Sequence, residues 1–88
     1  MEAGILERAR AMLDRDPGGA LRETNRHAAE HTHGQLAAER EMIAVDALRR
    51  LGRTTEARRR AQRLIDRSPS SIYTERARAI LRELSEAP

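Results

Sequence analysis

A short segment of this chain has residue types and spacing that could bind a metal ion. In His27-Ala28-Ala29-Glu30-His31, the two histidines lie one turn apart if the segment is helical, so both imidazoles share one side of the helix. Such a pair can share a zinc ion, and Glu30 would then be placed to act as a general base. A third ligand is needed, which His33 or a distant acid such as Glu83 would have to supply.

We nevertheless expect no catalytic residue, no cofactor and no metal site, with His27 and His31 as the only metal-ligand candidates. A five-residue pattern is weak evidence for a metal site, and packed or surface histidines are expected instead. Glu39 and Glu41 suit the dipole at a helix start, and nothing in the sequence suggests that they are buried as a catalytic pair. The chain has no cysteine. The sequence therefore predicts a protein that is not an enzyme.

The arginine-rich stretch at positions 49–67 is the second candidate site. Lysine is absent, so all 17 basic residues are arginines, and against 14 acids they give a formal net charge of +3. Such a stretch suits phosphates or an acidic protein surface. Proteins that bind nucleic acid usually add aromatic rings, and Tyr73 is the only aromatic residue here, so nucleic acid is the alternative partner. The predicted basic patch within positions 49–67 consists of Arg58, Arg59, Arg60, Arg63 and Arg67.

Apolar residues at helical spacing predict an all-α fold with five helices in a single domain. Asp16-Pro17 is a strong helix start, Gly52 favours a left-handed helix end, and Thr54 or Thr55 is the expected cap of the next helix. Short connections require neighbouring helices to be antiparallel. No apolar run is long enough to enter a membrane. The helices are predicted at about residues 2–13, 17–31, 35–51, 54–67 and 72–84.

One stretch carries a family resemblance. The segment LGRTTEARRRAQRLIDRSPSS resembles the second half of a tetratricopeptide repeat, with Leu51, Gly52, Ala57, Leu64 and Pro69 at matching places. It departs from that pattern at Ala61, where a large aromatic is expected, and at Val45, where a small residue is usual. The resemblance implies an α-solenoid of two helical hairpins and a capping helix, with repeats over residues 1–34 and 35–71 and the cap over 72–88.

The arginine- and alanine-rich chain looks similar to short C-terminal domains of bacterial FecR-like or anti-sigma-factor regulators. This resemblance implies a soluble protein-binding scaffold within a larger protein, and it leaves open whether the domain lies in the cytoplasm or on the periplasmic side of a membrane-anchored parent. The groove would lie between residues 2–13 and 35–51, and the expected partner contacts are Arg40, Glu41 and Arg49. Self-association through the last helix is an alternative, with candidate residues Tyr73, Ile80 and Leu84.

Overall fold

The fold is entirely helical wherever the chain is described. A computed structural model describes residues 2–31 and 36–86, and these ranges contain five α-helices and no strand, as the sequence predicted. None of these helices is both long and apolar enough to cross a bilayer. The predicted start of the third helix at Gln35 lies outside the described residues. The helices are α1 (Glu2–Met12), α2 (Pro17–Glu30), α3 (Ala37–Arg50), α4 (Thr54–Arg67) and α5 (Thr74–Glu86).

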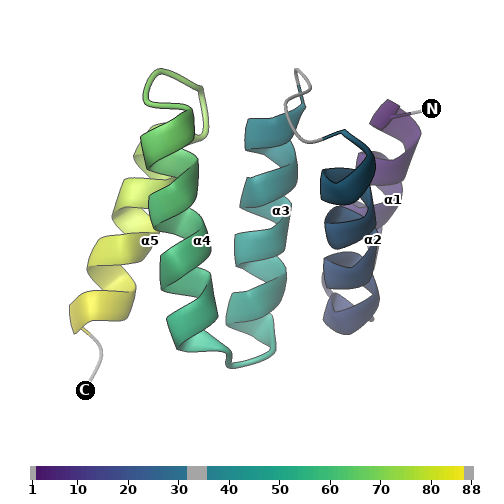
Figure 1. The fold of residues 1–88 in the computed structure, drawn as a ribbon. Helices are drawn as coiled ribbons and strands as arrows, with labels where there is room; N and C mark the ends of the chain where they lie inside the picture. Colours follow the sequence, from purple (N-terminus) through teal and green to yellow (C-terminus); the bar gives the residue numbers. More distant parts are fainter. Residues whose placement is uncertain (1, 32–35, 87–88) are drawn as a thin grey trace.

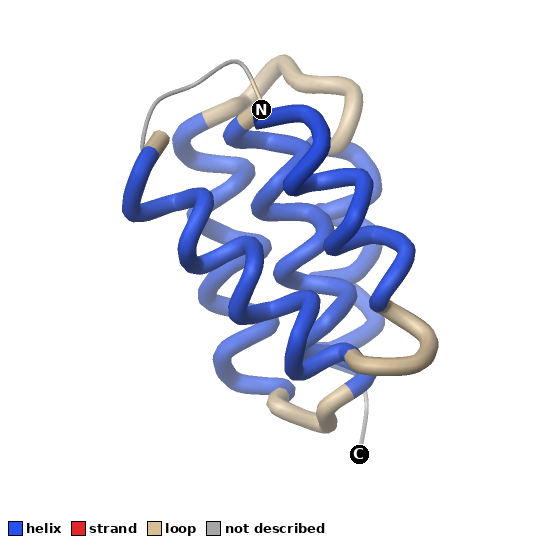
Figure 2. The backbone as a smooth tube through the Cα atoms, turned by 90° about the vertical axis from the view of Figure 1, so that its right-hand side faces the viewer, coloured by secondary structure: helices blue, strands red, loops and turns tan. Residues whose placement is uncertain are grey.

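The five helices form a flat slab of 39 × 30 × 18 Å. Each helix packs against the next one in the chain, and α3 also contacts α1. Figure 1 shows α1 behind α2 and α5 behind α4, with α3 between the two pairs. A quarter turn away, in Figure 2, the helices run side by side and the connections gather at the two ends. The slab thus has one broad face formed by α2 and α4, and another formed by α1, α3 and α5.

The start of α2 follows the local sequence signals. Asp16 is the N-cap, its carboxylate accepts a hydrogen bond from the Gly19 backbone N–H at 2.9 Å, and Pro17 occupies the first helical position. A Cβ on Gly19 would lie 2.4 Å from the Met12 methyl carbon and 2.3 Å from an Asp16 carboxylate oxygen. A larger residue at this position would therefore displace the Met12 side chain and the Asp16 carboxylate that caps α2.

The turn between α3 and α4 ends one helix as predicted and starts the other differently. Gly52 has a φ of +73°, and the backbone N–H groups of Gly52 and Arg53 donate to the carbonyls of Arg49 and Leu48 at 3.0 and 2.9 Å. This is a Schellman helix end. The predicted threonine cap is wrong, because Arg53 is the N-cap residue and no side chain caps α4. The Arg53 guanidinium instead bonds both carboxylate oxygens of Glu56 at 2.9 Å.

Helix α5 begins two residues later than predicted, because hydroxyl groups hold the preceding turn. The Thr74 hydroxyl donates to the Ser68 carbonyl at 2.5 Å, and the Ser71 hydroxyl accepts from the Tyr73 backbone N–H at 3.2 Å. These bonds satisfy the Tyr73 N–H and the Ser68 carbonyl within the turn, before the first hydrogen bonds of the helix form. Ile72 is left 87% exposed at the tip of the turn.

Helix α3 is the centre of the core. Every residue from 40 to 48 is buried, because α3 packs against α1, α2 and α4 at once. One apolar cluster joins α1, α2 and α3 with Ala57 of α4, and a second joins α3, α4 and α5. Leu51 is 38% exposed just past the helix end. A helix covered on most sides must bury any charged residue that its sequence contains, and α3 contains three such residues in this range, Arg40, Glu41 and Asp46.

Candidate functional site

Glu41 ties three helices together on the α2/α4 side of α3. Its carboxylate accepts hydrogen bonds from Arg40 at 2.7 Å and from Arg60 of α4 at 2.8 and 3.3 Å. The same Arg60 guanidinium reaches α2, where it donates to the Asn25 side-chain oxygen at 2.6 Å. Since Glu41 is only 8% exposed, these bonds replace nearly all of the water around its carboxylate. A single arginine of α4 thus links α2, α3 and α4.

The two arginines keep this buried carboxylate charged. Burial raises the pKa of Glu41, but the hydrogen bonds and positive charges of Arg60 and Arg40 outweigh burial and hold the pKa below its ordinary value of 4.5. Arg40 is itself 4% exposed, and it also donates to the His31 carbonyl at 2.9 Å. The Arg40–Glu41–Arg60 network is therefore a charged and hydrogen-bonded group within the protein interior.

Asp46 is the other buried carboxylate of α3, and it faces α1 and α5. It is 7% exposed and accepts one hydrogen bond, at 2.9 Å, from Arg76 of α5. Burial raises the pKa of Asp46 above its ordinary value of 3.8, although the charges of Arg76, Arg50, Arg49 and Arg10 act in the opposite direction. Four guanidinium groups around Asp46 therefore offset its loss of hydration only in part.

Most arginines around Asp46 also have acidic partners at the rim of the α1/α3/α5 face. Arg49 donates to Glu83 of α5 at 2.7 Å, and Arg50 donates to Asp14 at 3.2 Å. Arg10 of α1 pairs with Glu39 of α3. The Asp14 and Glu83 side chains are 87% and 61% exposed, so water screens both pairs.

Two hollows open on this face around Asp46. Both are lined by Asp46, Arg50 and Arg76. The smaller, of about 230 Å³, also contains Arg10, Leu13, Met42, Ile43 and Tyr73. The larger, of about 520 Å³, also contains Arg49, Thr54 and Leu84. Together they form a groove across α1, α3 and α5 whose accessible lining is more polar than apolar, with Asp46 and arginines supplying the polar groups.

The expected partner contacts are placed differently from the prediction. Arg40 and Glu41 were expected on an exposed side of the third helix, but both are buried between α2 and α4. The correction follows from the central position of α3, which leaves no exposed side along residues 40–48. Arg49 is half-buried and lies on the predicted groove, where it pairs with Glu83.

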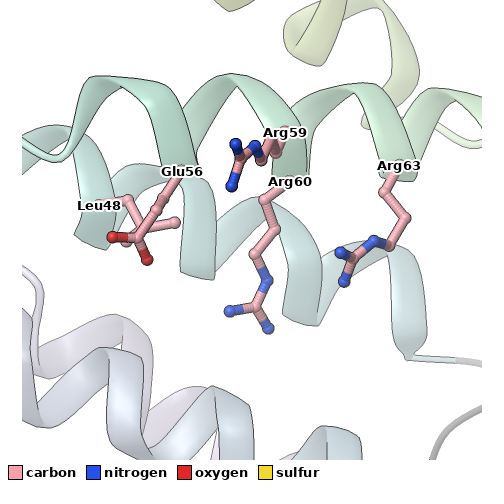
Figure 3. Close-up of a pocket in the computed structure, with 5 residues that line it drawn as sticks. All are labelled: Leu48, Glu56, Arg59, Arg60 and Arg63. Carbon is pink, nitrogen blue, oxygen red and sulfur yellow. The ribbon is translucent and has the colours of Figure 1, made fainter.

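The predicted basic patch divides into one half-buried and several exposed arginines. Arg60 is held by Glu41 and Asn25, whereas Arg58, Arg59, Arg63 and Arg67 are exposed and form no ion pair with any described residue. Figure 3 shows Arg60 and Arg63 extending in the same direction from α4, across α3. A shallow hollow of about 230 Å³ lies here, lined by Leu48, Glu56, Arg59, Arg60 and Arg63.

The two candidate metal ligands, His27 and His31, are at least half-buried, and their imidazole rings lie near each other. The His27 side chain is fully buried, and its ring centroid lies 5.1 Å from that of the half-buried His31. The Arg40 guanidinium lies 3.5 Å from His27 Nδ1. Its positive charge would repel a metal ion bound to this imidazole. Within residues 2–31 and 36–86, no group of three or more acidic or histidine side chains is placed to hold a metal ion. His33 lies outside the described residues.

Of the candidate self-association residues, Ile80 is buried, and Tyr73 and Leu84 are half-buried. Ile80 is 3% exposed and belongs to the cluster formed with α3 and α4, and Tyr73 and Leu84 pack against that cluster. The opposite side of α5 is exposed and carries charged residues, among them Arg78 and Arg82. These three apolar residues therefore do not form an exposed apolar surface on the last helix.

Several residues of the site were not predicted from the sequence. Asn25 and Arg76 owe their roles to packing between helices that are distant in sequence, and no local pattern marks them. Asp46 could have been found, because it is the only charged residue in the apolar run 42–48. An acid in such a run is buried in most packings of the helix.

Comparison with protein-family models, with curated proteins and with solved structures finds no match for this chain.

Proposed function

We propose that this chain is a protein-binding domain without catalytic activity of its own, and that its partner binds in the α1/α3/α5 groove. The observation that carries the proposal is the pair of hollows that meet at Asp46, Arg50 and Arg76. Peptide-binding sites typically combine an apolar floor with a few directed polar groups. Here apolar side chains of α3, of α5 and of the turns beside α1 and α5 line the hollows together with Asp46, and arginines supply most of the polar groups.

A ligand can replace the acidic partners of the arginines at the rim of the groove. The Arg49–Glu83 and Arg50–Asp14 pairs are exposed, and such pairs contribute only about 0–1 kcal/mol each. Carbonyl or carboxylate groups of a bound segment can replace the acidic partners at little cost in free energy. A peptide would thus gain apolar contacts within the groove and hydrogen bonds from guanidinium groups.

The relation to tetratricopeptide repeats belongs to the same proposal. Its support is that consecutive helices pack as antiparallel neighbours and that α1 and α3, the first helices of the two expected hairpins, contact each other. In this interpretation α5 is the capping helix, and its exposed charged side suits that role. The parent would be a larger bacterial regulatory protein in which the domain acts as a scaffold.

Peptide selection tests this function directly. A displayed library of random peptides would be selected on the immobilised protein, and enriched peptides would then be tested on two variants. Arg50→Glu places a negative charge in the groove, whereas Arg58→Glu makes the same charge change on an exposed position of α4 outside it. We expect peptides that bind wild type and Arg58→Glu but lose binding to Arg50→Glu. Failure to enrich any peptide, or equal binding to both variants, would contradict the proposal.

A further inference from the structure

Helix α4 carries a row of exposed arginines at four-residue spacing. Arg59, Arg63 and Arg67 follow one another at positions i, i+4 and i+8, so their Cα atoms rise by about 6 Å per step along one side of the helix. All three side chains are exposed, and none forms an ion pair with a described residue. On the α1/α3/α5 face, by contrast, the arginines around Asp46 have acidic partners, as described above.

The acidic residues of α4 do not neutralise this row. Glu56 is bonded at both oxygens by Arg53, and Asp66 accepts a hydrogen bond from Gln62 at 2.9 Å. Arg60, which lies between Arg59 and Arg63 in the chain, is committed to Glu41 and Asn25. The row therefore has an unbalanced positive charge on a helix whose position is fixed by a buried network.

A shallow hollow lies beside this row of arginines. The hollow of about 230 Å³ beside it contains Arg59 and Arg63 and has Leu48 of α3 at its floor (Figure 3). Glu56 and Arg60 also line the hollow, and Arg60 extends from α4 to Asn25 of the neighbouring α2. One turn before Asn25, α2 adds the exposed Arg22, which also has no ion pair with a described residue. This face can thus receive a helix along α4 with arginines on both sides.

We propose that the α2/α4 face binds an acidic α-helical segment of a partner protein, whose carboxylates recur at every fourth position opposite Arg59, Arg63 and Arg67. Carboxylates at i, i+4 and i+8 of a helix have the same rise of about 6 Å, so an antiparallel helix can pair each one with an arginine. This surface is separate from the groove of the proposed function, and either one can fail without the other.

The sequence itself argues against a second copy as the occupant. No two acidic residues of this chain are four positions apart, so another copy has no matching row of carboxylates. Nucleic acid is less favoured because binding of single strands relies on base stacking. Tyr73, the only aromatic residue, packs against the α3–α5 cluster and does not lie on this face. The partner is therefore a different protein with an acidic helix.

A pair of synthetic peptides provides the probe. One is a fluorescently labelled alanine-based helix with glutamate at every fourth position, and the other has the same composition with the glutamates moved to different sides of the helix. Binding would be measured by fluorescence anisotropy at low and at physiological salt. We expect the spaced peptide to bind several-fold more tightly than the permuted one, and the difference to persist at physiological salt.

Two double variants of equal charge complete the design. Arg59→Gln with Arg63→Gln removes two members of the row, and Arg8→Gln with Arg82→Gln removes two exposed arginines from α1 and α5. The first should weaken binding of the spaced peptide by about tenfold, and the second by less than about twofold. Circular dichroism would verify that both variants are folded.

Three outcomes would overturn the inference. Equal binding of the two peptides, or equal losses in the two double variants, would show that diffuse charge alone attracts acidic ligands. Absence of binding by either peptide would remove the site. A labelled single-stranded RNA that binds more tightly than the spaced peptide at physiological salt, and that loses binding in the Arg59/Arg63 variant, would assign the face to nucleic acid.

Discussion

Helix α3 buries two carboxylates on opposite sides, Glu41 and Asp46, which differ in their hydrogen bonds and in the direction of their pKa shifts. Glu41 receives hydrogen bonds from two largely buried arginines and has a lowered pKa, whereas Asp46 receives one from an exposed arginine and has a raised pKa. Three more arginines near Asp46 act only through their charge. Hydrogen bonds together with the charges of Arg60 and Arg40 therefore outweigh burial at Glu41, whereas the charges around Asp46 do not.

The difference separates a structural network from a surface that can bind. The Glu41 network links α2, α3 and α4, and the outer arginines of α4 have no ion pair within the described part of the chain. Around Asp46, the exposed ion pairs leave a groove whose polar groups can exchange partners. We therefore expect substitutions on the Glu41 side to affect stability and substitutions at the Asp46 rim to affect binding.

The largest expected effect is that of Glu41→Gln. The substitution leaves the buried Arg40 without its charged partner, and breaking a buried pair in this way is strongly destabilising, by about 2–4 kcal/mol at neutral pH. Urea unfolding followed by circular dichroism at neutral pH would measure the loss. Glu83→Gln, which removes an exposed partner of Arg49, is the control and should cost less than about 1 kcal/mol. Similar losses in both variants would show that burial of the Glu41 network is unimportant.

The pH dependence of stability should separate the two acids. The folded-state pKa of Glu41 lies below 4.5, so its contribution is present above that value and is lost as pH falls through the folded pKa. The folded-state pKa of Asp46 lies above 3.8, so its ionisation opposes folding at neutral pH, and this penalty disappears as pH falls towards 3.8. The deficit of Glu41→Gln relative to wild type should therefore shrink in acid. A deficit that stays constant down to the lowest pH at which the protein folds would contradict the assignment.

A smaller effect is expected for Asp46→Asn. The fold favours the neutral form of this group, and an asparagine oxygen can still accept the Arg76 hydrogen bond, so the free energy of unfolding at neutral pH should change by less than about 1 kcal/mol. The same urea experiment measures it. A loss as large as that of Glu41→Gln would mean that the two sides of α3 are equivalent.

The smallest effect is expected on the exposed row of α4. Arg63→Gln should change stability by no more than about 0.5 kcal/mol, because Arg63 has no ion pair with a described residue. Arg60→Gln, on the same helix, should cost about 1–2 kcal/mol because it breaks the bonds to Glu41 and Asn25. Thermal unfolding in one buffer would compare the stabilities of the two variants. If Arg63→Gln were the less stable one, Arg60 would not be the structural arginine of the basic patch.

The sequence predicts the local features of this fold well and its buried charges poorly. The Asp16-Pro17 start and the Gly52 end depend on residues that are neighbours in the chain, so their signals are local. Arg40 and Glu41 are typical of an exposed helix start, and they are buried only because α2 and α4 cover α3 from both sides. Arg60 is one of five arginines on α4, and only the place of Glu41 in space distinguishes it.

The most direct test of this account is a double-mutant cycle on Glu41 and Arg60. Unfolding free energies of wild type, Glu41→Gln, Arg60→Gln and the double variant would give their coupling energy, with the exposed pair of Arg49 and Glu83 as the reference cycle. We predict a coupling of about 1–2 kcal/mol for the buried pair and below about 0.5 kcal/mol for the exposed one. A coupling near zero for Glu41 and Arg60 would contradict the claim that this network joins α2, α3 and α4.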